Sequence, residues 1–445
     1  MVQGPMLLVI LVVAVAFIVL MTARVKMNAF LVLILTALGT ALAAGMEPAK
    51  AISTVTTGFG NLVTSVGLVI ICGTIIGTFL QKSNATITMA NTVLKVIHRS
   101  KAALAMGITG VITSSTVFCD SGFIILNPLN KVLSKKTGIS FTTMTVALSL
   151  GLYTSHCLIP PASGPIAGTA LLGLTDYIGF IMLYGIIIAI PTTFVSYTWA
   201  KWIGKKVPTV ADVEVDNVEE KNLPGAWKAF TPILVPILLI ASRSIANFPG
   251  HPLGEGFVRL FLDAVGTPNM AMLIGVFCAF PLMPKWNVEY MNGWVNEGMR
   301  NCALILIITA AGGALGEVLR ATQIGQYLGN SLAQFNLGIF LPFLIAAAMK
   351  MAQGSSTVAI ITACGIVGPM MTSIGLTTPY AQALVVPAIG AGAMVVSHAN
   401  DSYFWVVTNF SGLDVNTIYK AHTMGTLIQG CTIILCVFVM SLFIV

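Results

Sequence analysis

The tetrapeptide Ser114-Ser115-Thr116-Val117 occurs twice in this chain, returning as Ser355-Ser356-Thr357-Val358 roughly 240 positions later. Further motifs recur in the same order and at nearly the same distance, namely Gly73-x-x-x-Gly77-x-x-Leu80 as Gly312-x-x-x-Gly316-x-x-Leu319, Pro128 as Pro369, and Ser155-His156 as Ser397-His398. One short match can arise by chance, whereas several in order indicate an internal duplication. The sequence therefore predicts two homologous halves.

The chain that carries this duplication is strongly apolar. Of its 445 residues, 56% are hydrophobic and only 8% are charged, against about 25% charged in a typical soluble domain. A soluble fold of this length could not cover its surface with so few charges, so we expect an integral membrane protein whose surroundings are the lipid bilayer. The net charge of +7 is then explained by membrane topology, because Lys and Arg gather in cytoplasmic loops. Nucleic-acid binding is excluded.

Membrane-spanning segments can be marked off by charges and turns, at about 20 residues each. Ten are expected, at 6–22, 28–46, 60–80, 141–159, 178–200, 229–242, 270–283, 301–319, 381–397 and 424–443. The first is expected to be a retained helix and not a cleaved signal peptide. Two other stretches, 102–130 and 337–369, are too long for one span and are interrupted by small polar residues, so we expect re-entrant hairpins.

Basic residues predict how the two halves are oriented. Lys and Arg flank 102–130 at both ends, which places both ends of this hairpin in the cytoplasm. Following the spans from there puts most of the 22 Lys and Arg inside and makes the hairpin 337–369 open from the outer face. The fold expected is an all-α polytopic membrane protein with two repeats of inverted topology, an arrangement typical of secondary transporters that bind substrate between the repeats.

The predicted organisation has three parts. The N-terminal repeat, 1–200, holds scaffold helices, the hairpin and a broken helix at about 141–165. A hydrophilic cytoplasmic linker follows at 201–228. The C-terminal repeat, 229–445, holds the second hairpin and a broken helix at about 381–410.

The repeated hydroxyl residues are the first candidates for a substrate site. A hairpin that reverses inside the bilayer leaves unpaired N–H and C=O groups, and helix N-termini carry partial positive charge suited to a carboxylate. The alternative is that these hydroxyls bond back to carbonyls within an ordinary membrane helix. The candidate substrate-binding residues here are Ser114, Ser115, Thr116, Ser355, Ser356 and Thr357.

Ionisable residues inside apolar segments are costly and therefore functional candidates. Asp120 follows the first tetrapeptide and is expected to carry a proton, the alternative being a hydrogen-bonded structural acid. Lys350 precedes the second tetrapeptide; it would bind a substrate carboxylate or extend to the outer interface. Asp401 would serve in proton coupling, or simply as a helix N-cap.

Polar residues also mark the ends of two long spans. His156 and His398 occupy equivalent positions, followed by Pro160-Pro161 in one half and by Asn400-Asp401-Ser402 in the other. We expect His156, Asn400 and Ser402 to contact substrate hydroxyls, the alternative being that such a histidine bonds a terminal carbonyl.

Several kinds of chemistry have no support in the sequence. There is no phosphate-binding Gly-x-x-x-x-Gly-Lys-Ser/Thr motif, no metal-ligand spacing and no catalytic triad in a credible context. No cofactor, no metal and no enzymatic activity are expected, and the eight cysteines are expected to be free, buried thiols.

The chain resembles the gluconate permease family of bacterial inner-membrane transporters, which are gluconate:H⁺ symporters within the wider ion-transporter superfamily. The likeness extends over nearly the whole chain, and its matching stretches are 116–123 with Asn127-Pro128-Leu129, Ser155-His156 with Pro160-Pro161, 310–314, 354–359 and 398–405. It implies elevator-like movement, a homodimer, and uptake of small hydroxy or sugar acids. Two departures, Asp120 in place of the usual glutamate and Ala162-Ser163 in place of His-Pro, leave the particular acid open.

Together these observations predict proton-coupled uptake of a small hydroxylated monocarboxylate across the bacterial inner membrane. Two related alternatives stay open, namely Na⁺-coupled carboxylate symport and proton-coupled uptake of D-serine or another amino acid. From other classes, a passive channel or an intramembrane enzyme would lack concentrative uptake or would alter the substrate.

Overall fold

The computed structural model is all-helical. It describes residues 2, 4–97, 101–210, 223–247, 256–324, 327, 337–399 and 401–444, and among these residues there is no β-strand. The expected all-α class is confirmed. Of the predicted linker 201–228, residues 211–222 lie outside the described residues.

The helices follow the chain in this order: α1 (Met6–Val19), α2 (Ala29–Ala43), α3 (Pro48–Lys82), α4 (Ala85–Val96), α5 (Ala102–Thr113), α6 (Cys119–Thr137), α7 (Phe141–Leu158), α8 (Ser163–Leu171), α9 (Ile178–Lys206), α10 (Ala226–Ala246), α11 (Phe257–Val265), α12 (Pro268–Ala279), α13 (Val288–Ala321), α15 (Phe340–Gln353), α16 (Ser356–Val367), α17 (Pro379–Ala383), α18 (Val385–Met394), α19 (Ser402–Ser411), α20 (Val415–Ile418) and α21 (Met424–Ile444). Short 3₁₀ or π turns extend several of them, including the π-helical turn Tyr419–Thr423 before α21.

Five helical segments in the described chain are long and apolar enough to cross a bilayer, and a sixth is added if α11 and α12, bent by 72°, form one broken span. Several shorter apolar helices supplement them. The structure differs from the sequence prediction in length: α3 and α13 run well beyond 60–80 and 301–319. The first halves of both helices are polar, so the hydropathy of the sequence did not show that each helix starts earlier. Pro48 and Asn287 provide ordinary helix starts. Helices α4 and α11 were not predicted.

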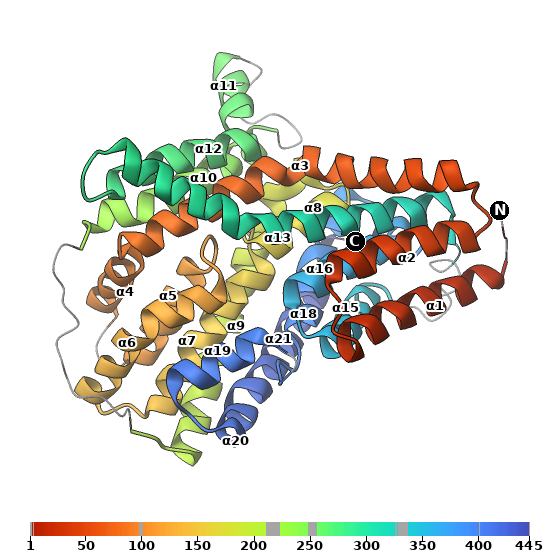
Figure 1. Ribbon diagram of the computed structural model, residues 1–445. Helices are drawn as coiled ribbons and strands as arrows, with labels where there is room; N and C mark the ends of the chain where they lie inside the picture. The colour runs from red at the N-terminus through yellow and green to blue at the C-terminus, as the bar shows by residue number, and fades with distance from the viewer. Residues whose placement is uncertain are drawn as a thin grey trace.

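Two long helices pack against each other along one side of the fold. Helices α3 and α13 lie against each other along much of their length and cross the top of the view in Figure 1. Where they touch, Gly58 on α3 faces Gly313 on α13, so that a Cβ on Gly313 would lie 2.7 Å from the Gly58 carbonyl oxygen. Small residues are what permit such close backbone approach between membrane helices.

The remaining helices pack in matched pairs. Helix α2 packs on α13 while α12 packs on α3; α5 packs on α7 while α15 packs on α18; and α6 packs on α19 while α16 packs on α8. In each pair the second contact repeats the first with the two halves exchanged, as a duplicated chain would produce. The inverted orientation of the halves, and the domain boundaries drawn from it, stay predictions.

Both long interrupted stretches are helix pairs joined by a short turn. We call residues 114–118, between α5 and α6, tip 1, and residues 354–355, between α15 and α16, tip 2. Gly354 has φ +85°, a left-handed conformation that favours glycine. Each predicted broken helix is also interrupted, at 159–162 between α7 and α8 and at 395–401 between α18 and α19. That these pairs re-enter the membrane stays a prediction.

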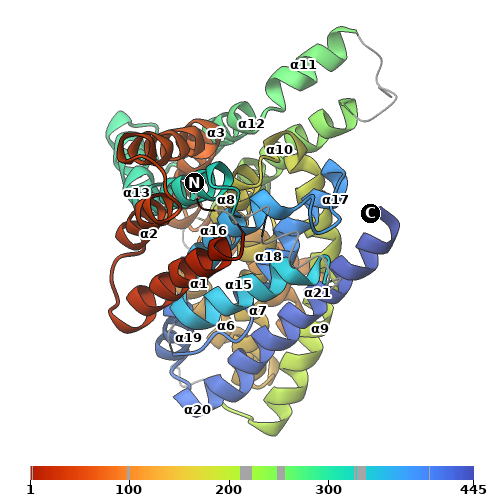
Figure 2. The ribbon, with the colours of Figure 1, turned by 90° about the vertical axis from the view of Figure 1, so that its right-hand side faces the viewer.

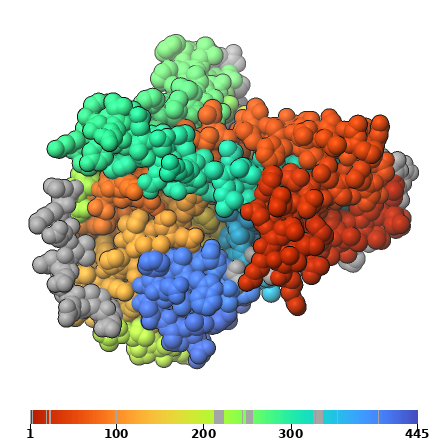
Figure 3. All heavy atoms as spheres, viewed as in Figure 1, coloured from red at the N-terminus to blue at the C-terminus, as the bar shows by residue number. Residues whose placement is uncertain are grey.

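The N-terminal helices lie at one end of the molecule. Figures 1 and 3 show α1 and α2 on the right, with α3 above them extending across the top of the view, and in Figure 2 this end faces the viewer. All eight cysteines are free, as expected. The prediction that all of them are buried is wrong for three, because Cys431 is exposed and Cys278 and Cys436 are only partly buried.

Candidate functional site

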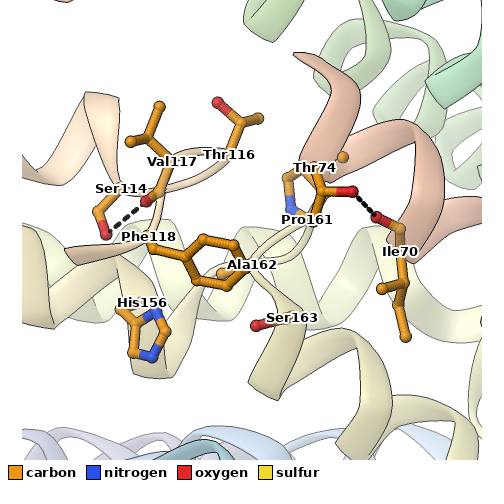
Figure 4. A pocket seen from close by; sticks show the side chains of 11 residues that line it. Ile70, Thr74, Ser114, Thr116, Val117, Phe118, His156, Pro161, Ala162 and Ser163 are labelled. Carbon is orange, nitrogen blue, oxygen red and sulfur yellow. Dashed lines mark hydrogen bonds between the residues drawn. The ribbon is translucent and has the colours of Figure 1, made fainter. Parts of the chain in front are cut away.

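Tip 1 closes one side of a small pocket that has both polar and apolar lining residues. Residues from tip 1, from α3, from α7 and from the break at 159–162 converge on a space of about 20 Å³, which is room for about one water molecule. Figure 4 shows Ser114, Thr116, Phe118, His156 and Ser163 around it. The pocket therefore brings together the first hairpin and the first broken helix, which the sequence analysis treated separately.

The three hydroxyl residues of tip 1 have different surroundings. Ser114 Oγ donates to the Val117 carbonyl at 3.1 Å and so closes the turn, while Ser115 Oγ donates to the Ile112 carbonyl at 2.8 Å. Ser115 lines a separate apolar groove between α5, α9 and α10 and not the tip 1 pocket. Thr116 Oγ1 is buried without a hydrogen-bond partner among the described residues, as is Ser163 Oγ. These two unpaired hydroxyls are free to bind a ligand.

Two helix N-termini meet at this pocket. Helices α6 and α8 begin after Phe118 and Ala162, both of which line the pocket, and neither helix has a side-chain cap. The corresponding helices of the second half are capped: Ser355 Oγ accepts from Val358 N at 3.4 Å on α16, and Asp401 Oδ1 accepts from Tyr403 N at 3.1 Å on α19. Uncapped first turns leave N–H groups and partial positive charge available to an anion.

A buried ion pair lies in the second half. Lys350 Nζ on α15 lies 2.6 Å from Asp401 Oδ2, and both side chains are almost completely buried. The same carboxylate oxygen accepts from Ser397 Oγ at 2.6 Å and from Tyr153 OH at 3.2 Å. Such partners are what a buried charge pair requires. Of the alternatives for Lys350, extension to the outer interface is therefore wrong, and Asp401 is an N-cap as well as an ion-pair partner.

Tip 2 is joined to this pair and to α7. Lys350 Nζ donates to the Gly354 carbonyl oxygen and, at 3.3 Å, to Ser356 Oγ. Ser356 Oγ also lies 2.5 Å from Tyr153 OH. Next to it, Thr357 Oγ1 is 3.4 Å from His156 Nε2. Since His156 also lines the tip 1 pocket, α7 connects the two tips.

Asp120 lies in the first turn of α6, directly after tip 1. Its Oδ1 atom is buried and has no hydrogen-bond partner among the described residues. The charges of Asp401 and Lys350 are close enough to act on it electrostatically. An ionised carboxylate in this place would be incompletely compensated, which is unusual for a buried charge.

The structure brings together most of the predicted site residues, with clear exceptions. Ser402 begins α19 and is exposed, Ser115 faces the apolar groove, and Asn400 lies outside the described residues. Prediction from sequence missed Tyr153 and Ser397. Tyr153 could have been found from its position one helical turn before His156, since residues three apart share a helix face.

A sequence profile of the GntP family permeases matches residues 6–443. The chain belongs to this permease family. The permease is 30% identical to the gluconate permease of Zymomonas mobilis over 98% of both chains. It is 28% identical to the D-serine transporter DsdX of Escherichia coli over 97% of both chains.

The fold of this permease is also similar to that of a solved transporter. The crystal structure of Alcanivorax borkumensis YdaH superposes with a TM-score of 0.66 at 15% identity, covering 93% of this chain and 98% of the other. The family and these relatives make the permease a multi-pass membrane transporter and not an enzyme. The resemblance stated from the sequence is thus confirmed.

Proposed function

We propose that this permease is a symporter that carries a small hydroxylated monocarboxylate together with a proton across the bacterial inner membrane. The observation that carries the proposal is the meeting of two uncapped helix N-termini, α6 and α8, at a pocket with unpaired hydroxyls. Relatives named for gluconate and for D-serine, both small carboxylates with hydroxyl groups, support the substrate class.

The substrate carboxylate binds at the N-termini of α6 and α8. Backbone N–H groups of these first turns would donate hydrogen bonds to the carboxylate, and the hydroxyls of Thr116 and Ser163 would donate further ones. His156 lies beside them and is placed to donate to a substrate oxygen. This mode needs no resident cation next to the carboxylate, which agrees with Lys350 being paired to Asp401.

Asp120 carries the proton in this proposal. Its carboxylate shares the first turn of α6 with the substrate site, so binding of an anion would place two like charges at one buried helix end. Such a pair is unfavourable unless one member takes up a proton. Substrate binding and protonation of Asp120 would therefore favour each other, which is the thermodynamic requirement for symport.

The Lys350–Asp401 pair supports the site from the second half. It fixes tip 2 against α7 through Ser356 and Tyr153. It also sets the field at Asp120 with no net charge of its own. The predicted direct roles of Lys350 in substrate binding and of Asp401 in proton transfer would require this pair to open during the cycle.

Uptake into proteoliposomes under an imposed pH gradient tests the proposal. With glycerate, gluconate and D-serine as labelled substrates, the wild-type permease is expected to accumulate at least one of them in response to an inward proton gradient. Asp120→Asn is expected to lose gradient-driven accumulation while keeping exchange of internal for external substrate, because exchange needs no net proton movement. Asp176→Asn, which changes a mostly exposed carboxylate, is the control.

Two results would contradict the proposal. Full gradient-driven accumulation by Asp120→Asn would show that another group carries the proton. Accumulation that stops when choline replaces Na⁺ and ignores the pH gradient would establish Na⁺ coupling instead. Cross-linking in the membrane tests the homodimer that the family resemblance implies.

A further inference from the structure

A second cavity adjoins the tip 1 pocket and has no assigned role. It has a volume of about 170 Å³ and shares Thr74, Thr116, Val117 and Phe118 with the smaller pocket. Its far side is formed by the two long helices, with Thr78 and Gln81 on α3 and Asn301 on α13. The cavity thus continues from the proposed carboxylate site to α3 and α13.

The lining of this cavity is polar and uncharged. Its polar side chains are Thr74, Thr78, Gln81, Thr116, Ser121 and Asn301, and all its lining residues are neutral. Thr78 Oγ1 donates to the Thr74 carbonyl at 2.9 Å, so its oxygen lone pairs remain to accept from a ligand. Amides can both donate and accept, and Thr116 Oγ1 lacks a partner. Neutral groups of this kind suit hydroxyls and would give a second carboxylate no counter-charge.

The volume limits the length of the ligand. A cavity of about 150 Å³ accommodates a benzene molecule, so a cavity of about 170 Å³ holds a three- or four-carbon acid, whereas the six-carbon chain of gluconate would extend out of it past the exposed Asn301. Ser121, in the first turn of α6, lines the same space. An acid with its carboxylate at that N-terminus would therefore direct its hydroxyl end toward Thr78, Gln81 and Asn301.

We infer that this cavity is the subsite for the hydroxylated end of a three- or four-carbon hydroxy acid, and that Thr78, Gln81 and Asn301 determine the specificity of the permease. The inference rests on the proposed function and narrows its substrate class. It assigns substrate recognition to α3 and α13 as well as to the hairpin.

Binding of four acids to the purified permease in detergent, measured by titration calorimetry, tests this. Glycerate carries hydroxyls on a three-carbon chain, lactate carries one, propionate carries none, and gluconate is longer. Glycerate is expected to bind most tightly, with gluconate and propionate at least tenfold weaker. Thr78→Val and Gln81→Met should each weaken glycerate five- to tenfold, the usual effect of one lost hydrogen bond, and leave propionate unchanged.

One control and one further test variant keep the result interpretable. Thr64→Val removes an exposed hydroxyl from the same helix and should change nothing. Asn301→Ala repeats the test of Thr78→Val and Gln81→Met at an exposed position, where the substitution does not disturb the packed interior. Gluconate binding as tightly as glycerate, or variants that weaken glycerate and propionate equally, would overturn the inference. Failure of all four acids to bind would instead reject the proposed function.

Discussion

At the scale of single residues, the Lys350–Asp401 pair is the most demanding feature of the molecule. Removing two charges from water costs several kcal/mol per ion, and only close geometry with added hydrogen bonds offsets this. Here Ser397 and Tyr153 supply those bonds to the carboxylate, and tip 2 supplies them to the ammonium. Loss of either partner would leave the other charge buried and alone.

We therefore expect Lys350→Met and Asp401→Asn each to destabilise the permease by about 3–5 kcal/mol, and the double variant to cost much less than their sum. Unfolding of the detergent-solubilised protein by denaturant or heat measures this. The matched control is the Lys82–Glu297 pair at 2.9 Å, whose side chains are 43% exposed; Lys82→Met should cost about 1 kcal/mol or less. Additive effects at positions 350 and 401 would argue against a coupled buried pair.

At the scale of elements, the crossing of α3 and α13 depends on glycine. These helices approach so closely at Gly58 and Gly313 that their backbones touch, and a Cβ on Gly313 would also lie 2.9 Å from Leu62 Cβ. A methyl group added at Gly313 would meet the backbone carbonyl oxygen of Gly58 and the Cβ atom of Leu62, and neither of these can move aside on its own. The two helices would therefore have to separate.

Gly313→Ala is accordingly expected to destabilise the permease by about 1–3 kcal/mol, as overpacking does in well-packed cores. Gly60→Ala is the matched control, because nothing lies within 4 Å of its Cβ position; alanine in a helix interior should there stabilise by about 0.5–1 kcal/mol. The unfolding midpoints of both variants, compared with that of the wild-type permease, measure these two effects. Equal effects would mean that the crossing tolerates an added methyl group.

At the scale of the whole molecule, the proposed function makes a prediction about what drives transport. The charges of Lys350 and Asp401 cancel. If Asp120 carries the proton as proposed, the site of the empty carrier has the charge of Asp120, and the site of the loaded carrier has the charge of the substrate. The carrier then crosses with the same charge in both directions. Net transport of one anion with one proton moves no charge.

Accumulation should therefore follow the pH gradient and ignore voltage. A potential of 100 mV supplies about 2.3 kcal/mol per net charge moved, equivalent to about 50-fold accumulation. We expect that a potassium diffusion potential of this size, imposed on proteoliposomes without a pH gradient, changes accumulation less than twofold. Accumulation of tens of fold under voltage alone would require a second proton or another cation.

The sequence predicted the breaks in the helices better than the contacts between them. Tip 1, Gly354 and Pro160-Pro161 are local signals, because hydroxyls, glycine and proline act on the backbone where they stand. The Lys350–Asp401 pair joins residues 51 positions apart and depends on how α15 packs on α18. The position of Tyr153 one turn before His156 marks it as a candidate, but its role depends on its contacts with Ser356 and Asp401, which lie far away in the sequence. The cavity beside α3 and α13 could not be predicted, since both helices read as scaffold.

The difference in capping between the two halves gives each a separate task. In the second half, the Asp401 carboxylate caps the start of α19, whereas no side chain caps the start of α8 in the first half. Duplication of an ancestral gene would thus have given two equivalent helix N-termini, one permanently capped by a carboxylate and one uncapped. In the proposed function, the substrate carboxylate occupies the uncapped N-terminus during transport and takes there the place that Asp401 holds in the other half.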